Sequence, residues 1–249
     1  MKSSINVSKE NSKDNESAKP NPILESLKSD YFLQKLYDIM PKKKKLEIVK
    51  YNKKVQNRLD LGIKDYKEYS ETYSSIEIEI IPTKGKYGKF ININENDKLY
   101  YHIYFNDNKE EIKNKYEIEE EDKVTKIKII IDYQVKSFRE LFKRCECIES
   151  INVKKFYRNN ITDMNCMFFG CYTLKELNLN NFNTNNVTDM SWMFRLCSSI
   201  KELNLNNFNT NNVTNMSCMF YGCSGSDDLK RKIKSENKNF KDEAFLFDD

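Results

Sequence analysis

The feature that most constrains this 249-residue chain is a 26-residue repeat between Tyr133 and Ser224. The segment NNFNTNNVT occurs at 180–188 and again at 206–214. The step of 26 residues relates Thr162, Thr188 and Thr214, then Met164, Met190 and Met216, then Phe168, Phe194 and Phe220, then Cys171, Cys197 and Cys223. With a more divergent first copy, we identify three full units and a fourth that ends after Gly222-Cys223. Such a period indicates stacked units that bury their apolar faces against one another.

Each unit contains two local patterns. Leu177 and Leu179 alternate as in a short strand, whereas Met164, Met167 and Phe168 have the i, i+3, i+4 spacing of one or two helical turns. The fold class that follows is α+β, built around a short leucine-rich-repeat-type solenoid over residues 135–224. It would have one strand and one short helix per 26-residue unit. A small helical segment and a β-rich N-terminal cap would precede it.

The repeat motifs also resemble a known family. NNVTDMSWMF, NNVTNMSCMFYGC and LKELNLNNFNT are similar to the BspA-like leucine-rich repeats of bacterial and protist surface proteins, over about 90 residues. The resemblance implies an architecture rather than an activity. Phe182 and Phe208 occupy the place where the ordinary leucine-rich consensus has Asn or Cys. We therefore expect a phenylalanine column instead of an asparagine ladder.

Four segments flank the repeats. Residues 1–21 are polar and charged, and are expected to be a disordered tail. Residues 22–72 carry helical apolar stripes on both sides of Pro41. Residues 73–134 form the β-rich cap, and residues 225–249 a C-terminal capping helix and tail. Strands are predicted at 76–80, 90–93, 100–104 and 124–131, the last of which could be the first rung of the repeats. We expect Ala244–Phe247 to pack over the last repeat or to serve as a docking motif.

Composition and motifs argue against several functions. The chain has 42 basic and 38 acidic residues, so its net charge is small. The electrostatic field of the whole chain therefore does not favour nucleic acid or an anionic membrane as a partner. His102 alternates with aromatic residues and lacks a nucleophilic partner, and no phosphate-binding loop occurs. We expect no enzyme, no cofactor and no metal. The repeated cysteines predict a buried thiol column, because a metal site at Cys166/Cys171 and Cys218/Cys223 would lack a nearby histidine.

The strand positions that point away from the core predict a polar face. Its candidate protein-binding residues are Glu149, Asn152, Lys154, Lys175, Glu176, Asn178, Asn180, Lys201, Glu202, Asn204 and Asn206. We expect a monomeric, non-enzymatic protein-interaction module that presents this face to an unknown protein partner. Alternatively, the amide columns would only stabilise the stack, through hydrogen bonds from one amide to the next.

A second hypothesis concerns the N-terminal segment. The helix–Pro–helix outline of residues 23–70 loosely resembles F-box adaptors, although DIMPKKKKLEIV lacks their leading Leu-Pro. In that case residues 23–70 would recruit machinery and the repeats would select a target. The sequence contains neither a secretory leader nor a long apolar span, so a cytoplasmic location is expected. The alternatives are the cell surface, as for the family relatives, or the nucleus through Lys42–Lys45.

Overall fold

The computed structural model describes residues 22–223, 226–237 and 239–246, and the chain divides into two compact units, Met1–Tyr69 and Ser70–Asp249. The predicted disordered tail, residues 1–21, lies outside the described part. The first unit is helical. Its helices are α1 (Pro22–Ser26), α2 (Asp30–Ile39), α3 (Lys42–Val49), α4 (Lys53–Arg58) and most of α5 (Ile63–Tyr73).

Local sequence explains where these short helices begin. The Ser29 side chain accepts a hydrogen bond from the Phe32 N–H at the start of α2, and Asn52 accepts one from Val55 at the start of α4. Pro41 separates α2 from α3, because proline disfavours helical backbone in the residue before it. The helices share a small core of their own, made by Leu24, Leu33, Leu46, Val49, Val55 and Leu59.

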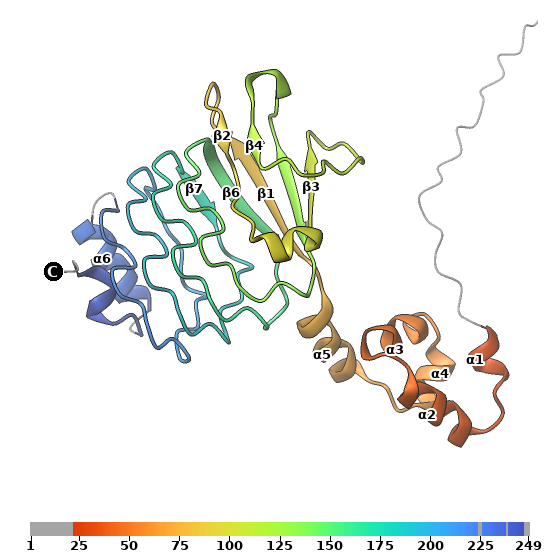
Figure 1. Cartoon of the computed structure of the whole chain (residues 1–249). Coiled ribbons are helices and arrows are strands. Elements are labelled where there is room, and N and C mark those ends of the chain that lie inside the picture. Colours follow the sequence, from red (N-terminus) through yellow and green to blue (C-terminus); the bar gives the residue numbers. More distant parts are fainter. Residues whose placement is uncertain (1–21, 224–225, 238, 247–249) are drawn as a thin grey trace, which may run out of the picture. The chain divides into compact units, whose positions relative to one another are not determined.

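The second unit begins with a five-stranded mixed sheet (Figure 1), whose strand order is β3-β5-β1-β6-β7. All neighbours in it are antiparallel except β6 and β7, which are parallel. Its strands are β1 (Ile76–Pro82), β3 (Tyr101–Phe105), β5 (Ile127–Ile131), β6 (Ile148–Lys155) and β7 (Glu176–Asn178). A separate ribbon pairs β2 (Gly88–Lys89) with β4 (Glu117–Ile118), and short 3-10 helices occur at η1 (Glu95–Tyr100) and η2 (Glu120–Asp122). Alternate residues from Ile76 to Ile80 in β1 and from Ile127 to Ile131 in β5 are fully buried, as the alternating sequence predicts.

Two strand predictions are wrong. Residues 90–93 are not a strand, because their backbone bonds go to different segments: Phe90 N–H donates to Tyr116 and Asn92 N–H to Leu141. Nor is β5 the first rung of the repeats. Instead β1 lies between β5 and β6 and pairs antiparallel with both. The edge of the first repeat strand is therefore covered by β1, which protects it from unwanted pairing.

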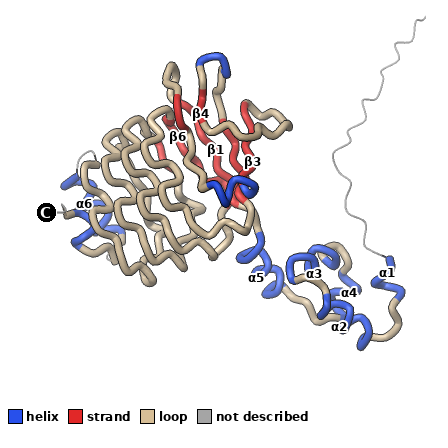
Figure 2. The backbone as a smooth tube through the Cα atoms, in the orientation of Figure 1, coloured by secondary structure: helices blue, strands red, loops and turns tan. Residues whose placement is uncertain are grey.

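The predicted repeat architecture, a leucine-rich-repeat-type solenoid with a short helix in each unit, is wrong. Between Ile131 and Ser226 the described residues contain no helix, and β6 and β7 are the only strands of that stretch (Figure 2). The segment expected to be helical is a run of tight turns. Met167 N–H donates to Met164 C=O at 3.2 Å and Phe169 N–H to Cys166 C=O at 3.1 Å. These i→i+3 bonds are those of β-turns and not of an α-helix.

Hydrogen bonds between units explain why turns replace the helix. Met164 N–H donates to Asp189 C=O at 2.9 Å, Cys166 N–H to Ser191 at 3.0 Å, and Phe168 N–H to Met193 at 2.9 Å. Bonds of the same kind join each unit to the next, and parallel bridges link Ser137, Asp163, Asp189 and Asn215. A helix would use these N–H groups internally, and so short a helix has a costly nucleus. We call the joined units, residues 136–223, the repeat stack.

The backbone of the turns also excludes a right-handed helix. Two residues per unit have a positive φ, and the first of them is a non-glycine residue in every unit: Glu140 (60°), Cys166 (56°), Trp192 (58°) and Cys218 (52°). Left-handed backbone costs a non-glycine residue about 1–2 kcal/mol. The bonds between units offset this cost, since each of these four residues donates its N–H to the next layer, at Asn165, Ser191, Ser217 and Glu243.

The core of the repeat stack consists of columns of identical side chains. The rings of Phe142, Phe168, Phe194 and Phe220 stack with centroids 5.6, 5.5 and 5.7 Å apart. The predicted second phenylalanine column is confirmed, because Phe182 and Phe208 stack at 5.7 Å. The buried thiol column is also confirmed, since the four cysteines at that repeat position are free and buried. They are Cys145, Cys171, Cys197 and Cys223.

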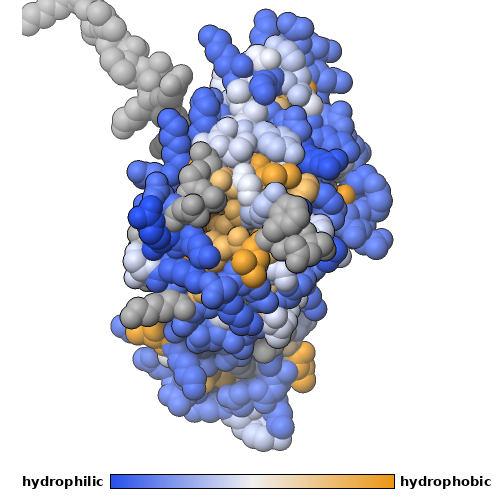
Figure 3. Space-filling view, turned by 90° about the vertical axis from the view of Figure 1, so that its left-hand side faces the viewer, coloured by the Kyte–Doolittle hydropathy of each residue, from blue (hydrophilic) through white to orange (hydrophobic). Residues whose placement is uncertain are grey.

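The C-terminal segment occupies the place of a further repeat. After α6 (Ser226–Glu236), the 3-10 helix η3 (Asp242–Phe245) accepts bonds from the last unit: Phe220 N–H donates to Ala244 C=O at 2.8 Å. The Phe245 ring stacks on Phe220 at 5.1 Å. The packing predicted for Ala244 is thus confirmed, whereas Phe247 lies outside the described residues. Seen from this end, hydrophobic surface lies in the middle of a mostly hydrophilic face (Figure 3).

A glycine pair tests the packing between turns. Gly222 and Gly85 have nearly the same φ, 71° and 72°, but a Cβ at Gly222 would lie 2.5 Å from Leu196 Cδ2, whereas nothing lies within 4 Å at Gly85. We expect Gly85→Ala to lower the free energy of unfolding by about 1 kcal/mol through backbone strain alone. Gly222→Ala should cost about 2–3 kcal/mol, because Leu196 must also move. Urea denaturation measures both; equal losses would mean that the Leu196 contact is unimportant.

Candidate protein-binding face

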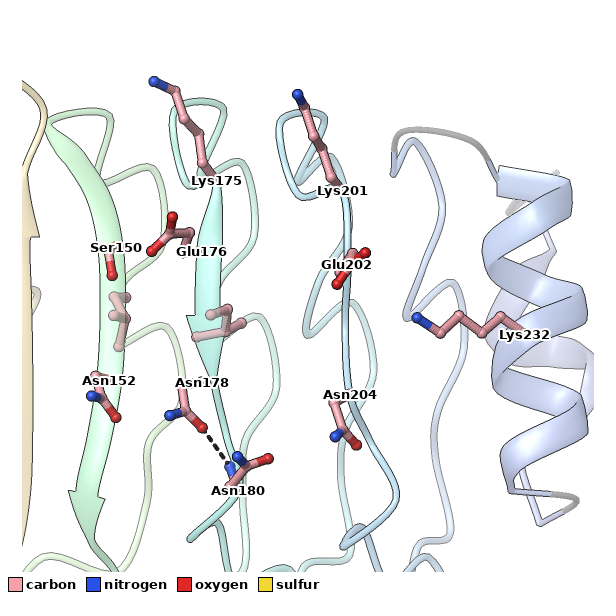
Figure 4. Close-up of a pocket in the computed structure, with 12 residues that line it drawn as sticks. Ser150, Asn152, Lys175, Glu176, Asn178, Asn180, Lys201, Glu202, Asn204 and Lys232 are labelled. Carbon is pink, nitrogen blue, oxygen red and sulfur yellow. Dashed lines mark hydrogen bonds between the residues drawn. The ribbon is translucent and has the colours of Figure 1, made fainter.

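A groove of about 730 Å³ crosses the strand face of the repeat stack. It spans β6, β7, the equivalent segment of the next unit and α6 (Figure 4). The residues that line it are Ser150, Ile151, Asn152, Lys175, Glu176, Leu177, Asn178, Asn180, Lys201, Glu202, Asn204 and Lys232. A single groove thus draws polar side chains from four successive elements.

The repeat arranges these side chains in rows. Lys175 and Lys201 extend side by side at one edge of the groove, and the amides of Asn178 and Asn204 lie at the other (Figure 4). A row of carboxylates, Glu176 and Glu202, runs between these edges. Because Ile151 pairs in register with Leu177, neighbouring strands and their rows are about 4.8 Å apart.

Only part of the charge in this region is paired. Lys175 Nζ lies 2.9 Å from Glu149 Oε1, and Lys154 Nζ lies 3.2 Å from Glu79 Oε1. Surface pairs of this kind contribute about 0–1 kcal/mol each. Lys201, Glu202 and Lys232 form no ion pair within the described part of the chain. Glu176 likewise forms no ion pair with any residue that the structure describes. These charges remain available to a partner.

The asparagine columns divide into two kinds. Asn178 Oδ1 and Asn204 Oδ1 each accept a bond from the N–H two residues later, at 3.0 Å, so that each side chain closes its own turn. Asn181 and Asn207 instead donate to backbone carbonyls of the preceding unit, at 3.1 and 2.8 Å. The second column therefore stabilises the stack through backbone carbonyls, and not through the amide-to-amide bonds of the alternative hypothesis. Asn178 and Asn204 keep their Nδ2 groups at the groove.

The structure brings together most of the residues proposed from the sequence. Eight of the eleven line the groove, and the other three, Glu149, Lys154 and Asn206, lie outside its lining. Sequence reasoning missed Lys232, because α6 does not belong to the repeat. Leu229 and Ile233 are buried on one side of α6, a spacing of four residues that places Lys232 on the exposed side.

The single histidine lies away from the groove lining. His102 Nδ1 is 3.1 Å from Glu111 Oε1, and Nε2 is 3.5 Å from Asp132 Oδ2. The ring is thus held between two carboxylates and has no nucleophile among these contacts. Within the described ranges, no group of three or more His, Cys, Asp or Glu side chains is arranged to hold a metal ion.

Comparison with known proteins reaches only the C-terminal half of the chain. Residues 136–247 match a family described as "Mycoplasma protein of unknown function, DUF285". This family is related to the BspA-type repeat proteins, in agreement with the resemblance of the repeat motifs. The matched range contains the repeat stack, α6 and η3. A search of curated proteins and a search of solved structures each gave no match. No helix in the described residues is long and apolar enough to cross a bilayer.

Proposed function

We propose that this chain is a non-enzymatic protein-interaction module that binds a protein partner through the groove on its strand face. The observation that supports this best is the set of charges without ion pairs in the described residues, Lys201, Glu202 and Lys232, gathered in one groove. The backbone holds them at fixed spacing, so binding would require little ordering of the face itself. Pre-organisation of this kind lowers the entropic cost of association.

The rows indicate the chemistry of the partner. A segment of the partner that lies in the groove would meet lysines at one edge, carboxylates in the middle and amide N–H groups at the other edge. Such a segment would place acidic side chains against Lys201 and Lys232, and a basic group against Glu176 or Glu202. Binding of this kind depends on salt, because charges on an open face are screened within about 10 Å at 0.1 M salt.

Site-specific photocrosslinking in the full-length protein tests this proposal. A crosslinking amino acid at Asn204 lies in the groove, and a control at Asn211 lies on an exposed loop outside its lining. We expect adducts with a discrete partner from Asn204 and not from Asn211. The double change Lys201→Glu and Lys232→Glu should weaken the adduct about tenfold or more, as should 0.5 M salt.

The result that would contradict the proposal is equally specific. Adducts of the same partner from Asn211, or adducts from Asn204 that both charge reversals leave unchanged, would remove the groove as the binding site. Neither lysine is buried, so the reversals are expected to leave folding intact. Circular dichroism of the variant checks this.

A further inference from the structure

The charge balance of the whole chain conceals a strongly basic helical unit. Residues 22–69 contain 12 Lys and Arg against 7 Asp and Glu, a net charge of +5. The whole chain carries +4, so the other residues together carry −1. The sequence-based expectation of no membrane partner rested on the total and not on this segregation.

The same unit exposes an apolar stripe on α2. Phe32, Leu36 and Ile39 are 66%, 37% and 77% exposed, and their spacing of four and three residues places them on one side of the helix. Leu33 is buried in the helical core and Tyr37 packs against it, so the core occupies a different side. The helix therefore has one apolar side in the core and another in solvent.

Three exposed lysines accompany the stripe in the sequence, and three carboxylates of the same unit have other partners. Lys28 precedes α2, Lys35 lies on it, and Lys44 follows Pro41; all three are exposed. Asp30 pairs with Arg58 at 2.6 Å, Asp38 accepts from Gln34 at 2.9 Å, and Glu25 accepts from Asn52 at 2.8 Å. In the part of the chain that the structure describes, no carboxylate forms an ion pair with any of these three lysines.

We propose that α2 binds the surface of a membrane containing anionic lipids. Phe32, Leu36 and Ile39 would enter the boundary between headgroups and acyl chains, and the lysines would contact the anionic headgroups. Neither a weak apolar insertion nor a polybasic segment alone anchors a protein stably to a membrane. The two contributions add, so together they would hold the helix at an anionic surface. This binding is independent of the groove on the strand face.

Other occupants fit the surface less well. Nucleic acid would use the lysines and the aromatic rings, but the aliphatic Leu36 and Ile39 gain nothing from a charged backbone. A second copy of the unit would bring two charges of +5 together, which repel each other. Anionic lipid satisfies both the charge and the aliphatic stripe.

Vesicle sedimentation with the full chain tests the proposal. We expect binding to phosphatidylcholine vesicles that contain about one third phosphatidylglycerol, little binding to phosphatidylcholine alone, and loss of binding in high salt. Phe32→Ser with Ile39→Ser should reduce the partition coefficient about 100-fold, because both exposed side chains lose their apolar surface. Leu99→Ser is the control, since Leu99 is 85% exposed and lies outside the helical unit.

Three outcomes would overturn the proposal. They are no binding to the anionic vesicles, a loss of binding in Leu99→Ser equal to that in the double variant, or binding of polyuridylic acid in place of vesicles. Circular dichroism of the double variant excludes unfolding as the cause of lost binding, and both substituted side chains are largely exposed.

Discussion

Phe194→Ala is expected to lower the free energy of unfolding by about 4 kcal/mol, because it leaves a cavity in the middle of the ring column. Phe194 is fully buried. Its ring stacks on Phe168 at 5.5 Å and on Phe220 at 5.7 Å, and it lies 6.5 Å from Phe208. Hydrogen bonds hold the layers on both sides in place, so the cavity has little room to collapse.

The neighbouring Phe169 supplies a matched control. It is partly exposed, and Lys143 and Arg144 each lie 5.8 Å from its ring centroid. Phe169→Ala should cost about 1 kcal/mol or less, the size of an exposed cation–π contact. Trp192 is the only tryptophan and lies in the repeat stack, so its fluorescence during urea denaturation reports on this stack. Losses of similar size in both variants would show that the ring column is not the main source of its stability.

The sequence predicts which residues share an environment more reliably than it predicts the backbone that holds them. A 26-residue step is enough to place Phe182 above Phe208 and Cys171 above Cys197. It also places Asn178 beside Asn204, whatever the conformation of each unit. For this reason the buried columns and most of the groove could be named before the architecture was known.

The helix prediction failed for a physical reason. The spacing of Met164, Met167 and Phe168 brings the three side chains to one side both in a helix and in successive turns. The choice depends on where the backbone N–H groups find acceptors, and here they find them in the next unit. No glycine marks the left-handed positions at Cys166 and Trp192, so the sequence gives little warning of them.

Strand order was equally hidden. The closeness in sequence of β5 to the first repeat strand suggested that the two were neighbours, but β1 separates them. Both β1 and β5 are isoleucine-rich, and each has a run of fully buried alternate residues. Their sequence patterns therefore do not show which of the two pairs with β6. Lys232 was not predicted as a groove residue for a related reason. The 26-residue period aligns only residues within the repeated units, and Lys232 lies on α6, outside them.

The cysteine column should make the protein unstable in alkali. Burial raises the pKa of Cys171 and of Cys223 to about 12, and the pKa values of Cys145 and Cys197 well above the ordinary 9.0. All four thiols also donate to backbone carbonyls, which favours the protonated form; Cys171, for example, lies 3.0 Å from the Phe142 oxygen.

The direction of the effect follows from which state releases protons first. Above pH 9 the thiols of the unfolded chain ionise while those of the folded chain stay protonated, so the unfolded state is favoured as the pH rises. Between pH 8 and pH 10, Cys171 and Cys223 alone should lower the free energy of unfolding by about 3 kcal/mol. The other two buried thiols act in the same direction.

The double variant Cys171→Ser and Cys223→Ser separates this effect from other alkaline titrations. A serine hydroxyl does not ionise in this range and can still donate to the Phe142 and Phe194 carbonyls. Whatever the variant loses at pH 8, its free energy of unfolding should then fall by about 3 kcal/mol less than that of the wild-type protein by pH 10. Urea denaturation at several pH values measures both curves. Parallel curves would mean that the two thiols ionise as readily in the folded protein as in the unfolded chain, and that the column is open to solvent.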